Sequence, residues 1–203
     1  MLQTRTVTPE LLELLYRLME VDLLQPFSLV GGTALALQLG HRESVDIDLF
    51  GSLPLEHNEI LDALGSIGNV RVKQQSRNIL ITEVEGIKVD FVSFKYPTLE
   101  NVKLDNNIRM FGLKDIAAMK ISAITQRGSK KDFVDLFYLL KHYTLDEIFE
   151  FYETKIRDGS RFLAYKSLHY FEDAEHQPLP LVYETDFSWE ICKNTILKEV
   201  KSM

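Results

Sequence analysis

The chain has 203 residues, of which 45% are hydrophobic and 26% are charged. This composition is ordinary for a folded globular protein and unlike that of a disordered one, and the length favours one domain or two tightly packed lobes. The formal net charge of -7 argues against nucleic-acid binding through the whole surface, so a polynucleotide would need a local basic patch.

The first elements predicted along the chain are a helix, a strand and a second helix. Thr8-Pro9-Glu10 has a capping threonine and a proline at the first helical position, which predicts an amphipathic helix that ends near Gln25-Pro26. A short apolar run over residues 27–30 predicts a strand. The glycine pair Gly31-Gly32 then leads into a helix over residues 33–39.

An acidic strand follows. Residues 45–50 alternate between apolar and acidic, which predicts a strand with Asp46 and Asp48 on one face. A helix is expected after Pro54. Further segments rich in Val, Ile and Phe predict three more strands, with Glu85-Gly86 as a two-residue hairpin loop, around residues 69–75, 78–84 and 87–94.

The second half has helical periodicity over residues 113–126, 132–141 and 145–156. The predicted fold class is therefore α+β, with a mixed sheet and flanking helices followed by a mainly helical C-terminal lobe. We expect an α/β core over residues 1–98 and a helical lobe, packed on that core, over residues 99–203.

Compartment and membrane association are predicted from what the sequence lacks. No window has the roughly 20 apolar residues that a membrane span needs, and residues 1–10 do not resemble a signal peptide. Cys192 is the only cysteine, so the chain can form no intrachain disulfide and no cysteine-based metal cluster. We expect a cytoplasmic protein with no membrane partner, in which Cys192 is an inert helix residue.

Three carboxylates carry the chemistry that the pattern indicates. Asp46 and Asp48 are two residues apart on one strand, about 6–7 Å apart along the backbone, so both can reach one metal ion. Asp90 is on a later strand and is the natural third carboxylate. Such a set suits Mg²⁺, with Mn²⁺ as a substitute, and could hold two ions for in-line phosphoryl transfer, with Asp90 as the third ligand or the base.

Two features beside the acidic strand could bind substrate. Gly31-Gly32 precedes a helix, whose N-terminus offers free N-H groups and a positive dipole end to a triphosphate. A glycine pair by itself is more often only a tight turn. His41 and Arg42 could also touch substrate, although a single histidine near a turn is more often exposed or structural.

The order and spacing of several motifs resemble the AbiEii/AbiGii family of nucleotidyltransferase toxins. The first motif is Leu29-Val-Gly-Gly-Thr-Ala-Leu-Ala-Leu37, and the second is His41-Arg-Glu-Ser-Val-Asp-Ile-Asp-Leu-Phe50. Later helical motifs continue the resemblance over Leu113-Lys-Asp-Ile-Ala-Ala-Met-Lys120, Arg127 and Lys131-Asp-Phe-Val-Asp-Leu136. The similarity covers roughly residues 27 to 140.

The resemblance implies a polymerase-beta-like nucleotidyltransferase fold and a phage-defence toxin, with an antitoxin protein as partner, that transfers a nucleotide from a nucleoside triphosphate. Some members of the family modify transfer RNA, which implies an RNA acceptor. Carried over by position, the nucleotide would be bound by Gly31, Gly32, Thr33, Lys120 and Arg127. The metal ligands would be Asp46, Asp48 and Asp90, and the catalytic set would be those three with Lys120 and Asp135.

The helical half allows a structural reading beside the catalytic one. Lys120 has apolar neighbours on its helical face, so it either contacts phosphate or packs its stem and extends its ammonium to water. Asp132 and Asp135 share a face, where ion pairs with Arg127 or a neighbouring lysine are as plausible as catalysis. A candidate polyanion patch is formed by Lys103, Arg109, Lys114, Lys120, Arg127, Lys130 and Lys131.

Two alternatives remain open on the sequence. One is a catalytically silent nucleotide-binding or protein-partner module with the same fold, which the intact aspartates argue against. The other is transfer of a nucleotide to a small molecule such as an antibiotic, for which an acidic acceptor pocket is expected in place of a basic patch.

Overall fold

The computed structural model describes residues 1–202, and their contacts divide the chain into two compact units. The first comprises Met1–Pro97 with Asn101–Phe111, and the second comprises Thr98–Glu100 with the chain from Gly112 onward. Among the residues that the structure describes, no helix is both long enough and apolar enough to cross a bilayer.

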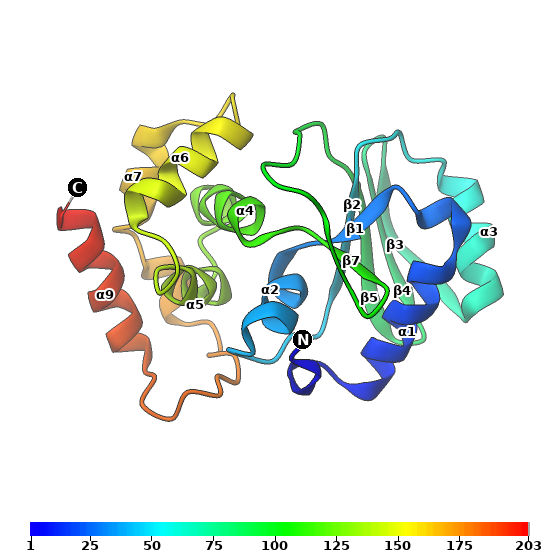
Figure 1. The fold of residues 1–203 in the computed structure, drawn as a ribbon, viewed down its shortest axis with the longest axis horizontal. Helices are drawn as coiled ribbons and strands as arrows, with labels where there is room; N and C mark the ends of the chain where they lie inside the picture. Colours follow the sequence, from blue (N-terminus) through cyan, green and yellow to red (C-terminus); the bar gives the residue numbers. More distant parts are fainter. Residues whose placement is uncertain (203) are drawn as a thin grey trace. The chain divides into compact units, whose positions relative to one another are not determined.

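A mixed sheet forms the centre of the first unit, as the sequence predicts, and it has seven strands (Figure 1). The strand order is β3-β4-β5-β2-β1-β7-β6, in which β2 runs parallel to β5 and β1 runs parallel to β7, while the other neighbouring pairs are antiparallel. The strands are β1 (Phe27–Leu29), β2 (Ile47–Gly51), β3 (Val70–Ser76), β4 (Ile79–Val84), β5 (Ile87–Ser93), β6 (Lys103–Asp105) and β7 (Ile108–Met110).

The two faces of this sheet differ in burial. On β2 and β5, the side chains of Ile47, Leu49, Val89 and Phe91 are at most 1% exposed. Figure 1 shows α1 (Pro9–Glu20) and α3 (His57–Ile67) side by side along one face of the sheet. Because successive side chains of a strand point to opposite faces, the aspartates of β2 and β5 are on the other face, away from these apolar residues.

Helix α1 begins as predicted but ends earlier. Thr8 caps it by accepting a hydrogen bond from the N-H of Leu11, and Pro9 occupies the first helical position. The helix ends at Glu20 and not near Gln25-Pro26, because Val21 takes an extended conformation. A separate 3-10 turn over Asp22–Leu24 then leads into β1.

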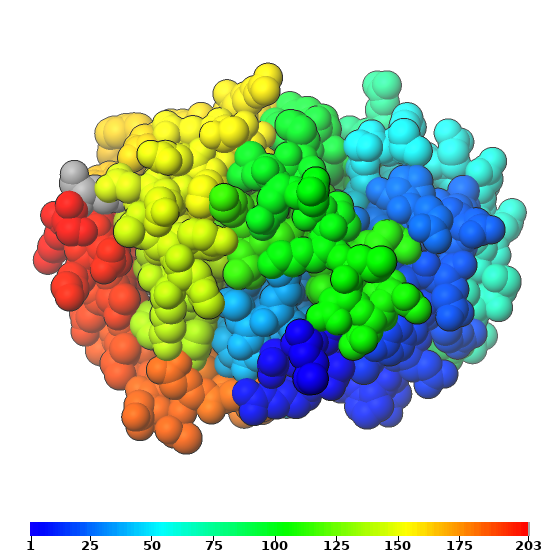
Figure 2. All heavy atoms as spheres, viewed as in Figure 1, coloured from blue at the N-terminus to red at the C-terminus, as the bar shows by residue number. Residues whose placement is uncertain are grey.

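Strands β6 and β7 were not predicted from the sequence. Asn106 and Asn107, both with positive φ, form the turn between them. The guanidinium of Arg109 fixes the hairpin to the unit by donating hydrogen bonds of 3.1 Å to three backbone carbonyls, those of Met19, Leu24 and Phe27. Figure 2 shows the hairpin in green against the blue N-terminal residues, where the amino group of Met1 lies 3.3 Å from Asp105.

The second unit is helical. A fully buried ion pair joins two of its helices: Lys155 Nζ lies 2.7 Å from Asp115 Oδ1, and both side chains are 0% exposed. The same carboxylate accepts hydrogen bonds from the N-H groups of Leu99 and Glu100, which ties that segment to the unit. The helices are α4 (Leu113–Gln126), α5 (Lys130–Leu139), α6 (Leu145–Lys155), α7 (Arg161–Ser167), α8 (Glu172–Glu175) and α9 (Trp189–Ser202).

Cys192 is on α9 and is fully buried. Burial, together with the nearby charge of Asp135, raises the pKa of its thiol to about 12. The thiol therefore stays protonated near neutral pH, which agrees with the prediction that Cys192 is inert.

Candidate active site

The acidic strand is shorter than predicted, and its two aspartates have different settings. Strand β2 begins at Ile47, so Asp48 is inside the strand while Asp46 directly precedes it. The hydroxyl of Thr33 donates a hydrogen bond to the backbone carbonyl of Asp46 and shares a second hydrogen bond, 2.8 Å long, with Ser44 Oγ. Thr33, a predicted nucleotide-binding residue, is 1% exposed, and its hydroxyl holds the entry to the acidic strand.

Asp48 and Asp90 are brought together by the sheet. They are directly paired in the parallel register of β2 and β5, so their side chains project from the same face of neighbouring strands. The Oδ1 atom of Asp90 is buried and has no hydrogen-bond partner in the protein. A buried carboxylate oxygen in that state is suited to accept a cation or a donor from a ligand.

A lysine that the sequence analysis did not single out lies beside Asp90. Lys88 Nζ forms a hydrogen-bonded ion pair with Asp90 Oδ2. Burial acts to lower the pKa of Lys88, but the hydrogen bond to Asp90 and the charges of Asp90, Asp48 and Asp46 outweigh it, so the pKa is raised. The ammonium group of Lys88 is thus close enough to interact with all three predicted metal ligands.

The donor chemistry of this face fits magnesium. Mg²⁺ is usually bound through one or two carboxylates and keeps its remaining positions for water and substrate phosphates, and Asp48 with Asp90 offer such a pair. Asp46 lies next along the chain as a third carboxylate. Over residues 1–202, no three His, Cys, Asp or Glu side chains are already gathered around a point that could hold a metal ion.

The backbone of Gly31 comes close to Asp48. Gly31 is the first residue of α2 (Gly31–Leu39) and has φ of +69°, which glycine adopts without steric cost. A Cβ atom on Gly31 would lie 2.5 Å from Asp48 Oδ2. No side chain caps the start of α2, so the N-H groups of Gly31 and Gly32 begin a helix whose positive end is beside the acidic strand.

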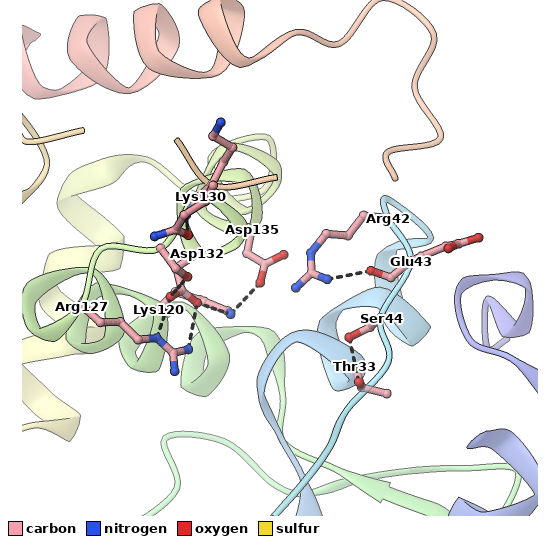
Figure 3. Close-up of polar contacts among 11 residues, drawn as sticks. Thr33, Arg42, Glu43, Ser44, Lys120, Arg127, Lys130, Asp132 and Asp135 are labelled. Carbon is pink, nitrogen blue, oxygen red and sulfur yellow. Dashed lines mark hydrogen bonds and ion pairs between the residues drawn. The ribbon is translucent and has the colours of Figure 1, made fainter. Parts of the chain in front are cut away.

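Arg42 is a second residue whose importance the sequence analysis underestimated. Its side chain is buried, only 3% exposed, and Nη1 donates a 2.7 Å hydrogen bond to the backbone carbonyl of Glu43 (Figure 3). Its Nη2 atom is among the atoms that a Cβ on Gly32 would meet. A guanidinium group therefore lies against Gly32 of the glycine pair. Because arginine stays charged at any ordinary pH, Arg42 could have been singled out in the sequence as a candidate to bind an anion.

In the helical unit, Lys120 is held by two aspartates. Its Nζ atom lies 2.9 Å from Asp132 Oδ1 and 2.6 Å from Asp135 Oδ2, and its side chain is 6% exposed (Figure 3). Both carboxylates are 0% exposed. The structure therefore gathers Lys120 and Asp135, two predicted catalytic residues, with Asp132, and the ammonium is already compensated inside the unit.

Asp132, which is not in the predicted catalytic set, has further charged and polar partners besides Lys120. It pairs with Arg127, whose Nε lies 3.0 Å from Oδ2, and it accepts a hydrogen bond from the hydroxyl of Ser129. Burial opposes ionisation of Asp132, but the charge of Lys120 and the hydrogen bond from Arg127 prevail and lower its pKa to about 2. The side chain of Arg127 itself remains 61% exposed.

Several members of the predicted basic patch are used inside the fold. Arg109 binds three carbonyls, and Lys130, which is 7% exposed, donates a 2.9 Å hydrogen bond from Nζ to the carbonyl of Glu175. Lys120 is neutralised as described above. These three residues hold parts of their own units together. Of the two arginines in the group, Arg127 is the one with a largely exposed side chain, and its guanidinium is anchored by Asp132.

Comparison with known proteins shows to which family the chain is related. The sequence profile of the family described as "Nucleotidyl transferase AbiEii toxin, Type IV TA system" matches residues 13–188. An uncharacterized protein of Aquifex aeolicus (strain VF5) is 38% identical over 204 residues, which cover 97% of each chain.

Solved structures show the same fold at low sequence identity. JHP933 from Helicobacter pylori superposes with a TM-score of 0.58 and 15% identity, over 97% of this chain and 92% of that one. MenT4, a nucleotidyltransferase toxin of Mycobacterium tuberculosis H37Rv, superposes with a TM-score of 0.59 and 15% identity, over 94% of this chain and 81% of the other.

Proposed function

Because the chain belongs to the AbiEii family of nucleotidyl transferase toxins, and is thus a nucleotidyltransferase, we propose that it transfers a nucleoside monophosphate from a nucleoside triphosphate to RNA with the help of magnesium. In this proposal Asp48 and Asp90 hold the metal, and Asp46 completes the acidic set. The chain acts as the toxin of a toxin-antitoxin pair, in which an antitoxin protein is its partner.

The observation that carries the proposal is the register of β2 and β5. This register sets Asp48 directly beside Asp90. The Oδ1 atom of Asp90 is buried there without a hydrogen bond. When bound there, magnesium would supply positive charge to the phosphate oxygens during in-line transfer. Asp90, as the carboxylate with an uncommitted oxygen, can also accept the proton of the attacking hydroxyl at Oδ1.

The start of α2 supports binding of a triphosphate. Gly31 has no side chain to keep an anion away, and the first N-H groups of the helix can donate hydrogen bonds to phosphate oxygens. The buried guanidinium of Arg42 adds positive charge beside Gly32. The role assigned here to Thr33 is indirect, because its hydroxyl holds Asp46 and Ser44 in place.

The two basic residues predicted to contact phosphate are assigned different parts. Arg127 is 61% exposed and anchored by Asp132, so its guanidinium can bind a phosphate group. Lys120 is 6% exposed and shared between Asp132 and Asp135, so we assign it the task of holding those carboxylates. Asp135 accordingly acts through Lys120.

The proposal is tested by incubating the pure protein with each labelled nucleoside triphosphate, magnesium and total RNA. The comparison is with Asp48→Asn, which removes the charge of one ligand at nearly constant size. Asp62→Asn, an exposed aspartate on α3, is the matched control. We expect label in RNA with the unmodified protein and the control, and a loss of about a hundredfold or more with Asp48→Asn.

Two other results would replace parts of the proposal. Label that appears only when a small-molecule acceptor such as an aminoglycoside replaces the RNA would move the acceptor to another chemical class. No label with any acceptor, together with measurable triphosphate binding, would indicate a nucleotide-binding module without turnover.

A further inference from the structure

Lys88 occupies a defined place in the acidic face. Lys88 and Asp90 are two residues apart on β5, so their side chains share one face of the sheet. Asp48 is paired with Asp90, and continuing the register from Ile47 and Val89 by one position sets Asp46 beside Lys88. Three negatively charged side chains and one positively charged side chain are thus neighbours, on β2, on β5 and at the residue that directly precedes β2.

The ammonium of Lys88 supplies a positive charge next to these carboxylates. It is hydrogen-bonded to Asp90 Oδ2, and its interactions with Asp48 and Asp46 are favourable. The Lys88 side chain is 45% exposed, whereas that of Asp90 is 14% exposed. A lysine with a flexible stem and this exposure can swing its ammonium out to water without disturbing the strand.

We infer that Lys88 is a built-in counter-cation, which offsets part of the negative charge of the acidic face in the metal-free protein and releases Asp90 when a divalent cation binds. This inference rests on the proposed function, because it requires that the metal bind at Asp48 and Asp90. Its physical reason is that the ammonium group and the metal ion compete for the same carboxylate, that of Asp90, and repel each other across it. Lys88 is therefore a positioning residue that sets how tightly the free protein binds metal.

An exposed ion pair of the helical unit provides a control. Lys141 Nζ lies 2.6 Å from Glu184 Oε2, and the Lys141 side chain is 44% exposed, close to the 45% of Lys88. Neither Lys141 nor Glu184 belongs to the sheet that contains Asp48 and Asp90. Removal of Lys141 should therefore leave metal binding unchanged.

The test is a titration of the full chain with Mn²⁺ in the absence of nucleotide, with free Mn²⁺ followed by electron paramagnetic resonance. Lys88→Gln should bind Mn²⁺ about fivefold more tightly than the unmodified protein, which is the order of magnitude for loss of one partly exposed competing charge. Lys88→Arg keeps the charge and should bind like the unmodified protein, as should Lys141→Gln. Equal or weaker binding by Lys88→Gln would overturn the inference.

A second measurement observes the release directly. The side-chain NMR signal of Lys88, identified by its loss in Lys88→Gln, should move on addition of Mg²⁺, while the signal of Lys141 should stay in place. The Asp48→Asn variant separates the two proposals. If the unmodified protein binds metal through Asp48 but the Lys88 signal does not move, only the counter-cation is wrong; if no variant binds metal, the metal-dependent function fails with it.

Discussion

The Oδ2 atom of Asp48 lies 2.5 Å from the place that a Cβ atom would take on Gly31. No real Cβ tolerates such a contact, so the start of α2 and the acidic strand can approach this closely only because residue 31 is glycine. The positive φ of Gly31 adds a second requirement for glycine at the same position.

We therefore expect Gly31→Ala to reduce nucleotide transfer by about tenfold or more, because the new methyl group displaces the Asp48 carboxylate. Steady-state transfer assays check the activity. The matched control is Gly86→Ala, where φ is +83° but no atom lies within 4 Å of the added Cβ. Both variants should lose about 1–2 kcal/mol of unfolding free energy from backbone strain, and equal activity in the two would contradict the role given to the close approach.

Lys120 and Arg127 bind the same carboxylate, yet their removal should have different costs. Lys120→Met leaves Asp132 and Asp135 buried without their shared cation, so we expect a loss of about 3–5 kcal/mol in the free energy of unfolding. Arg127→Met removes a side chain that is 61% exposed and should cost about 1 kcal/mol or less. Urea unfolding measures both, and a stable but inactive Lys120→Met would instead favour direct contact of Lys120 with phosphate.

The lowered pKa of Asp132 predicts a specific dependence of stability on pH. Its pKa falls from the ordinary value of 3.8 to about 2, so the folded protein binds this proton less tightly than the unfolded chain does. The resulting stabilisation, on the order of 2 kcal/mol, is present above pH 3.8 and is lost as the pH falls toward 2. Unfolding free energies measured between pH 5 and pH 2 should converge for the unmodified protein and Asp132→Asn, and parallel curves would refute the assignment.

The buried pair of Asp115 and Lys155 should be among the most sensitive positions in the helical unit. Lys155→Met leaves a fully buried carboxylate without its cation, and we expect a loss of about 3–5 kcal/mol in unfolding free energy. Lys141→Met is the exposed counterpart, since Lys141 and Glu184 are 44% and 42% exposed, and it should cost about 1 kcal/mol. Thermal unfolding of the two variants would show whether burial, and not the number of ion pairs, sets the cost.

Local patterns in the sequence were sufficient for much of the fold. The helix over Leu113–Gln126 has the predicted bounds, and the Glu85-Gly86 loop joins β4 to β5 with positive φ at both residues, as a two-residue hairpin requires. In each case the signal is carried by neighbours in the sequence: helical periodicity in the first, and turn residues between two apolar runs in the second.

Features that depend on distant parts of the chain were missed. Strands β6 and β7 have three residues each, too few for a periodic signal, and they exist because Met110 pairs with Leu29 and Arg109 reaches carbonyls some 80 to 90 residues earlier. The same holds for the candidate site. The sequence predicted that Asp48 and Asp90 would meet, but the closeness of Lys88 to the carboxylates of both strands follows from the register of two strands that are far apart in the chain.

The N-H groups of Leu99 and Glu100, which donate hydrogen bonds to Asp115, belong to a short segment that affects how recombination could exchange the two units. Residues 98–100 belong to the helical unit, while residues 101–111 return to the sheet, so the chain passes between the units at 97/98, 100/101 and 111/112. A single recombination event between two genes could not exchange one complete unit for another. A crossover before residue 101 would combine the sheet of one parent with β6 and β7 of the other, and a crossover after residue 111 would leave the N-H groups of residues 99 and 100 to bind an Asp115 equivalent from the other parent.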